Sequence, residues 1–266
     1  MKALSKVKGT GNAKDAKDAY DKWISAKESA VAAKDAKLFA EDKLRIAFNY
    51  ADDKQIQRVD NALLLSATHN VLSVTCSTIE SQGMKSLASI LNRGALPNCT
   101  QLLLSNNNIG DAGIAALAQA IEPGGSGALS QCTVLQLGSN TFGDAGITAL
   151  ADACGRGALP KCQTLSLDHN RISNTGLLAF ARAIMPGGDG PSPLPECTFL
   201  ILSGNLYRQQ PTAADIDSRL ALALDTALPK LSRLVLRKDA FTVLPPKLTE
   251  VCTRRNIDLS LTHVYV

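Results

Sequence analysis

Cysteine and histidine, the side chains that most often bind metal ions or act as nucleophiles, follow a spacing that predicts neither role. The 266-residue chain has seven cysteines and three scattered histidines, and no C-x-x-C. A zinc site needs converging ligands with paired short spacings. Four cysteines instead recur at intervals of 30 to 35 residues: Cys99, Cys132, Cys162 and Cys197. We therefore expect a column of buried thiols, because free cysteine packs as a small apolar side chain, and we expect no metal and no cofactor.

Aspartate and histidine are neighbours at Asp168 and His169. Successive side chains of a strand point to opposite faces, so we expect these two to point in different directions and to form an isolated polar pair. Elsewhere the chain has no visible set of nucleophile, base and orienting group. The sequence therefore predicts a protein that is not an enzyme.

The cysteines mark the start of a segment that occurs three times. It reads CTQLLLSNNNIGDAGIAALA at 99–118, CTVLQLGSNTFGDAGITALA at 132–151 and CQTLSLDHNRISNTGLLAFA at 162–181. Self-similarity at a fixed period indicates an array of stacked units, each made of one short strand and one helix. The side chains on which this chain's function depends must therefore be positioned by the stacking of repeats.

Further copies of this pattern flank the three clear ones. A degenerate first repeat starts at Val71 and has a helix at 83–91. A fifth starts at Cys197 with a helix at 213–227, and a sixth has a short helix after Pro246. The alternating apolar residues at 257–261 predict a closing edge strand.

The spacing L-x-L-x-x-N-x-(I/F), followed by Gly-Asp-x-Gly, resembles the leucine-rich repeat of the ribonuclease-inhibitor-like subtype over about residues 71–261. The resemblance implies an α/β solenoid, or horseshoe, of about six strand-helix repeats. It also implies a role as a scaffold for protein interaction, although the same fold has many different functions in other proteins.

Two polar positions of the repeat have structural explanations. The asparagines that follow each strand are expected to pair with backbone groups as a ladder: Asn107, Asn140, Asn170 and Asn205. Asp111 and Asp144 are expected to be the N-cap residues of the helices that they precede.

The segment 1–68 differs from the repeat domain at 69–266. No glycine or proline occurs between Asn12 and Gln82, and we expect helices at about 13–48 and 53–66. Two roles stay open. The helices cap the N-terminal end of the array, or they form an arm in which Tyr20 and Trp23 contact a partner.

Composition limits the classes of partner. A net charge of +4 predicts no nucleic-acid binding. No apolar run reaches the ~18 residues of a transmembrane helix, and the N-terminus has no apolar core of a secretory signal. Unpaired thiols suit a reducing intracellular compartment. We expect the cytoplasm, with a mitochondrion or plastid as the alternative.

The concave face of the array has one distinctive predicted feature. Phe199, Ile201 and Val235 are expected to be exposed there beside Arg233 and Arg237, as a partner-binding patch. We therefore predict a non-catalytic interaction or scaffold protein, a structural or accessory subunit of a larger assembly of proteins such as a multi-subunit complex. The alternatives are a small-GTPase regulator that resembles the Ran GTPase-activating leucine-rich-repeat family, and a repeat sensor similar to NOD-type receptors.

Overall fold

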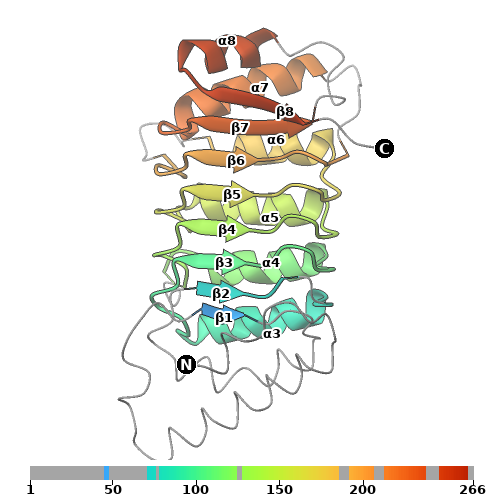
Figure 1. Cartoon of the computed structure of the whole chain (residues 1–266), viewed down its shortest axis with the longest axis vertical. Coiled ribbons are helices and arrows are strands. Elements are labelled where there is room, and N and C mark those ends of the chain that lie inside the picture. The colour runs from blue at the N-terminus through green and yellow to red at the C-terminus, as the bar shows by residue number, and fades with distance from the viewer. Residues whose placement is uncertain are drawn as a thin grey trace, which may run out of the picture.

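Parallel strands and helices alternate along the chain and stack into a solenoid (Figure 1). The computed structural model describes residues 45–47, 71–75, 78–124, 128–185, 192–206, 213–237 and 246–262. Within them the strands form one eight-stranded sheet in the order β1 to β8, with each neighbouring pair parallel. The predicted α/β leucine-rich-repeat solenoid is confirmed.

The strands line one face and the helices lie behind them (Figure 1). The strands are β1 (Arg45–Ala47), β2 (Val71–Ser73), β3 (Gln101–Leu103), β4 (Val134–Gln136), β5 (Thr164–Ser166), β6 (Phe199–Ile201), β7 (Arg233–Arg237) and β8 (Asp258–Thr262). The helices are α3 (Ser81–Asn92), α4 (Asp111–Ala120), α5 (Asp144–Gly155), α6 (Asn174–Ala183), α7 (Ala213–Ala227) and α8 (Pro246–Arg254). The predicted strands of the six repeats and the closing edge strand are present.

The strand β1 corrects the prediction of helix in the last residues of the range 13–48, for which the sequence favoured one long helix or two in tandem. Residues Arg45–Ala47 pair with Val71–Ser73 in parallel, so the sheet begins inside the segment 1–68. A three-residue strand carries too few residues to show a period in the sequence, and the open backbone edge of β2 decides its conformation. The rest of this segment, including Tyr20 and Trp23, lies outside the described residues, and its role as cap or arm stays a prediction.

The core consists of aligned columns that run through the stack. One column joins the central strand residues, all at most 1% exposed: Leu72, Leu102, Leu135, Leu165, Leu200 and Leu234. Each such leucine contributes about 1.5–3 kcal/mol of burial free energy. The inward faces of the helices close this core from behind.

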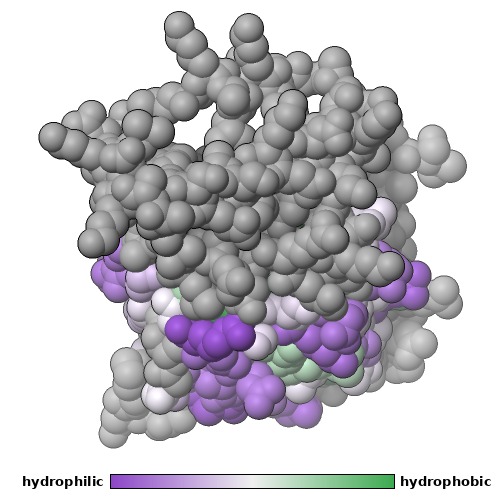
Figure 2. Space-filling view, turned by 90° about the horizontal axis from the view of Figure 1, so that it is seen from below, coloured by the Kyte–Doolittle hydropathy of each residue, from purple (hydrophilic) through white to green (hydrophobic). Residues whose placement is uncertain are grey.

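The described residues at both ends of the array present mainly polar side chains to the solvent. Seen from below Figure 1, onto the end that carries β1 and α3, the described surface is mainly hydrophilic with a small hydrophobic area (Figure 2). At the other end α8 buries Leu248, Val251 and Cys252 against the core. Lys247, Glu250 and Arg254 of this helix are exposed, so the described surface of the last repeat is polar, as expected of a terminal repeat.

Candidate functional site

The concave face over β5, β6 and β7 holds the predicted patch, but one of its members is not exposed. Phe199 and Ile201 are half-buried, whereas Val235 is only 7% exposed. The correction follows from the register, because Val235 lies between Ile201 of β6 and Ser260 of β8, which shield it from both sides. The backbone of Arg237 ends β7, and its side chain is not described.

Arg233 joins this patch and is itself partnered. Its guanidinium carbon lies 5.3 Å from the centroid of the Phe199 ring, within cation–π range. Its Nε lies 3.2 Å from Oδ2 of Asp258 on β8. The apolar ring and the carboxylate thus position this arginine over Phe199, with its side chain still 52% exposed, and its role in partner binding stays a prediction.

Asp168 and His169 contact each other, which corrects the expectation that they point in different directions. Nδ1 of His169 lies 2.9 Å from Oδ2 of Asp168. The pair lies beyond the end of β5, and His169 has a left-handed backbone with φ 52°, so the alternation of an extended strand no longer applies. The turn brings the ring back toward the carboxylate.

Ser166 extends this pair into a hydrogen-bonded set of three. Its hydroxyl donates to Oδ1 of Asp168, and the serine is 5% exposed. The order of contacts is serine to aspartate to histidine. In a serine-hydrolase triad the histidine takes the proton of the serine, whereas here the hydroxyl is bonded to Asp168. This arrangement presents a charged polar group and provides no activated nucleophile.

Two glycines make room for the pair, and sequence reasoning missed them. A Cβ at Gly138 would lie 2.5 Å from Oδ1 of Asp168, and a Cβ at Gly204 would lie 2.6 Å from Cδ2 of His169. Other repeats have Ser105 at the position of Gly138 and Asn106 and Ser139 at that of Gly204. Glycine thus replaces a polar side chain in each of the two repeats that flank Asp168 and His169, and this replacement was the signal available in the sequence.

The asparagine ladder is confirmed as a structural element. Nδ2 of Asn140 donates to the carbonyls of Leu104 and Leu137, both at 3.0 Å, and its Oδ1 accepts from the backbone of Ile109 at 3.1 Å. Asn107 and Asn205 make equivalent contacts across repeats. Asn170 donates to the carbonyls of Leu137 and Leu167, at 3.0 and 3.2 Å, but its Oδ1 has no hydrogen-bond partner among the described residues. The ladder therefore satisfies buried backbone groups and contributes no reactive group.

Asp111 and Asp144 do not cap their own helices, contrary to the prediction. The N-cap residues are Gly110 and Gly143, which make no side-chain cap. Oδ1 of Asp111 instead accepts from the backbone N–H groups of Gly143 and Gly146, at 2.7 and 2.8 Å, so it caps the helix of the next repeat. Asp144 reaches Ser173 in the same way.

The last repeat is fastened by contacts in both directions between α7 and α8. Asp217 of α7 accepts from the backbone of Lys247 at 3.1 Å and of Leu248 at 2.7 Å, at the start of α8. Arg255, just after α8, donates to the carbonyls of Leu228 and Pro229 at 2.6 and 2.9 Å. The two contacts satisfy the start of α8 and the end of α7.

The thiol column is buried, as predicted, and chemically inert. The sulfur atoms of Cys99, Cys132, Cys162 and Cys197 are free and buried. Burial raises the pKa of the Cys99 thiol to about 11 and that of the Cys132 thiol to about 12. In the described part of the chain no three or more cysteine, histidine or acidic side chains converge as they would around a metal ion.

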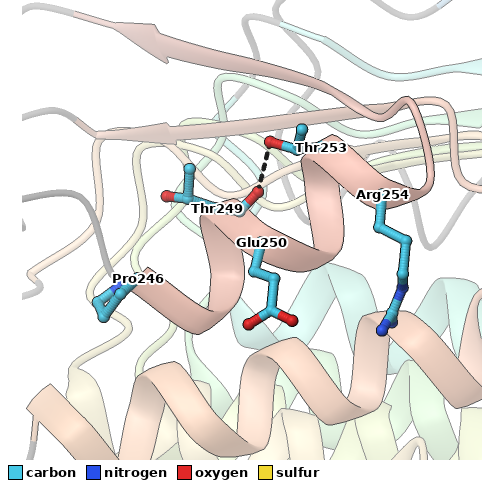
Figure 3. Close-up of a pocket in the computed structure, with 5 residues that line it drawn as sticks. All are labelled: Pro246, Thr249, Glu250, Thr253 and Arg254. Atoms are coloured by element: carbon cyan, nitrogen blue, oxygen red, sulfur yellow. Dashed lines mark hydrogen bonds between the residues drawn. The ribbon is translucent and has the colours of Figure 1, made fainter.

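A shallow hollow lies on the outer face of α8. Pro246, Thr249, Glu250, Thr253 and Arg254 line it, and Glu250 and Arg254 both point toward the neighbouring helix α7 (Figure 3). Nη2 of Arg254 lies 2.6 Å from Oδ2 of Asp225 on α7. This ion pair joins the last two helices. The hollow therefore belongs to the packing of the last repeat, and its lining residues do not form a set of nucleophile, base and orienting group.

Known proteins resemble this chain in its repeats. The family model for the leucine-rich repeat matches residues 100–118, 133–151 and 163–181, so these segments are leucine-rich repeats. The ribonuclease-inhibitor-like subtype stays a prediction. A search of curated proteins finds no match.

Two solved structures share part of the architecture. Leiomodin-1 Actin-Binding Site 2 is 20% identical, with a TM-score of 0.42 over 63% of this chain and 86% of that chain. An internalin (inlF) from Listeria monocytogenes is 16% identical, with a TM-score of 0.36 over 70% of this chain and 46% of that one. At this level of similarity neither structure indicates what this chain binds. Among the described residues, every helix is too short or too polar to cross a bilayer.

Proposed function

We propose that this leucine-rich-repeat protein is a non-catalytic interaction module that acts as a structural or accessory subunit of a larger assembly. One observation carries the proposal. The helices lie behind one face of the sheet, and no described helix covers the other face, along which the parallel strands follow one another (Figure 1). A rigid surface of this kind suits protein recognition.

The chemistry of that face supports binding rather than turnover. Its described residues include half-buried apolar side chains at Phe199 and Ile201 and a polar set around Asp168, in which the serine is bonded to the carboxylate. We also propose an intracellular, reducing location, because the four thiols of the repeat column are unpaired.

The proposal is tested by affinity purification and cross-linking mass spectrometry with the full chain as bait. Ile201→Asp places a charge on the concave face. The matched control is Leu222→Asp on α7, whose wild-type side chain is 47% exposed on the outer face. We expect Ile201→Asp to lose the stoichiometric partner and Leu222→Asp to retain it, with both variants unfolding at temperatures close to that of the wild type.

The alternatives predict different outcomes. Equal recovery of the partner by both variants would contradict binding through the concave face. A small GTPase as the stoichiometric partner would support the regulator alternative. Cross-links from lysines in residues 1–50 into the partner would identify an arm, whereas cross-links only back into this chain would identify a cap.

A further inference from the structure

We propose that Asp168 and His169 together form a binding site for a lysine or arginine side chain of the protein partner. The inference rests on the proposed function and assigns the residues and the ligand chemistry of its concave surface. It starts from the carboxylate of Asp168, whose ion pair within the described residues is made with His169 and with no lysine or arginine.

The pair presents acceptors and a negative charge. The carboxylate of Asp168 accepts from the hydroxyl of Ser166 and lies 2.9 Å from Nδ1 of His169. In the tautomer that carries its hydrogen on Nδ1, facing the carboxylate, the acceptor of the ring is Nε2. The side chain of His169 is 64% exposed and that of Asp168 is 23% exposed, so a partner can reach both.

The neighbouring strands show how this face holds a cation. Arg233 lies over the ring of Phe199 and pairs with Asp258, so its charge is already balanced. Within the described residues, the ion pair of Asp168 is made with His169 and with no lysine or arginine. A guanidinium or ammonium group from outside would complement this carboxylate.

The half-buried Ile201 on the next strand, beside Ser166, offers apolar surface for the stem of a basic side chain. Ile201 is the register partner of Ser166, the residue that bonds to Asp168. It is half-buried, so part of its side chain can still be covered. Long basic side chains pack their methylene groups on such surfaces while the charged end binds elsewhere. The site therefore favours lysine or arginine over a small cation.

Three successive repeats cooperate to build the site. Gly138 leaves space for the carboxylate of Asp168, and Gly204 leaves space for the ring of His169. Gly204 also has φ 71°, the left-handed conformation that glycine adopts most readily. A Cβ at either position would force the side-chain end that it meets to shift. The placement is therefore preorganised, which reduces the entropic cost of binding.

The test uses the immobilised full chain and libraries of seven-residue peptides with random flanks and one fixed central residue. The central residue is arginine, lysine, norleucine or glutamate. We expect peptides with central arginine or lysine to bind about tenfold more tightly than those with norleucine, the effect of one charge-assisted hydrogen bond. Asp168→Asn should abolish this preference, and Asp258→Asn, the matched control, should retain it.

Each other outcome overturns the inference. Equal binding of lysine and norleucine peptides, a preference for glutamate, or equal effects of Asp168→Asn and Asp258→Asn would exclude a basic-residue site at this pair. Absence of all peptide binding would also exclude it. The proposed function is judged separately, by whether the full chain recovers a stoichiometric protein partner at all, so the failure of one can be distinguished from the failure of the other.

Discussion

The carboxylate of Asp111 caps the helix of the next repeat, with its Oδ1 2.7 Å from the backbone nitrogen of Gly143. The same atom accepts from Gly146 at 2.8 Å, and a Cβ at Gly146 would also lie 2.8 Å from it. The Gly-Asp-x-Gly motif is therefore a contact between repeats. The acid of one copy fits against the two glycines of the following copy, and this contact couples the stability of adjacent repeats.

Asp111→Ala should lower the free energy of unfolding by about 1 kcal/mol, the usual effect of losing a helix cap. It leaves two N–H groups at the start of α5 without their acceptor. Urea unfolding followed by circular dichroism measures the change. The control Asp152→Ala removes an exposed acid of α5 and should change the value by less than about 0.5 kcal/mol. Equal losses for the two variants would contradict the capping role.

Leu137 tests the register of the repeats. Its side chain is fully buried, next to the half-buried Gln136 on the concave face. Leu137→Ala should cost about 2–5 kcal/mol by leaving a cavity, and Leu137→Asp should prevent folding because it buries an unpaired charge. Thermal unfolding measures both. Gln136→Ala is the control, with an expected loss below about 1 kcal/mol. A wild-type melting curve for Leu137→Asp would show that the register is wrong.

The thiol column predicts a loss of stability at alkaline pH. Burial raises the pKa of the Cys132 thiol from 9.0 to about 12. Above pH 9 the unfolded chain loses this proton while the folded protein keeps it, so ionisation favours the unfolded state. The contribution is fully present below pH 9 and is lost as the pH rises toward 12. At pH 10 the loss is roughly 1 kcal/mol for one thiol.

Urea unfolding at pH 8 and pH 10 isolates this effect when Cys132→Ala is compared with the wild type. The variant lacks the thiol, so the wild type should lose about 1 kcal/mol more than the variant between the two pH values. Native Cys132 should also resist iodoacetamide at pH 8, with modification read by peptide mass spectrometry. Rapid labelling of the folded protein would contradict a buried, neutral thiol.

Arg255 should determine how firmly the last repeat is attached. Arg255→Ala removes donors to the carbonyls of Leu228 and Pro229 and should increase hydrogen exchange in α8 and β8 by about tenfold or more, with little change in α4. Arg254→Ala, its neighbour, removes only an exposed ion pair with Asp225 and should have a small effect. Equal exchange in the two variants would contradict a specific role for Arg255.

The sequence by itself determined the repeated elements of this protein. The spacing of leucines, cysteines and asparagines placed β2 to β8, the helices, the thiol column and the asparagine ladder, because these features repeat with the period of the fold. Because the same pattern occurs in several copies, the positions of buried and exposed residues within one repeat can be read from the sequence by comparing the copies. The overall class of fold followed from the same evidence.

Only the tertiary structure decided what each residue meets in the next repeat. Asp111 was predicted to cap its own helix and caps another. Val235 was predicted to be exposed and is shielded by adjacent strands. Asp168 and His169 meet because one left-handed residue ends the alternation. In each case the deciding contact joins residues that lie about one repeat apart, or depends on a backbone angle that no periodic pattern encodes.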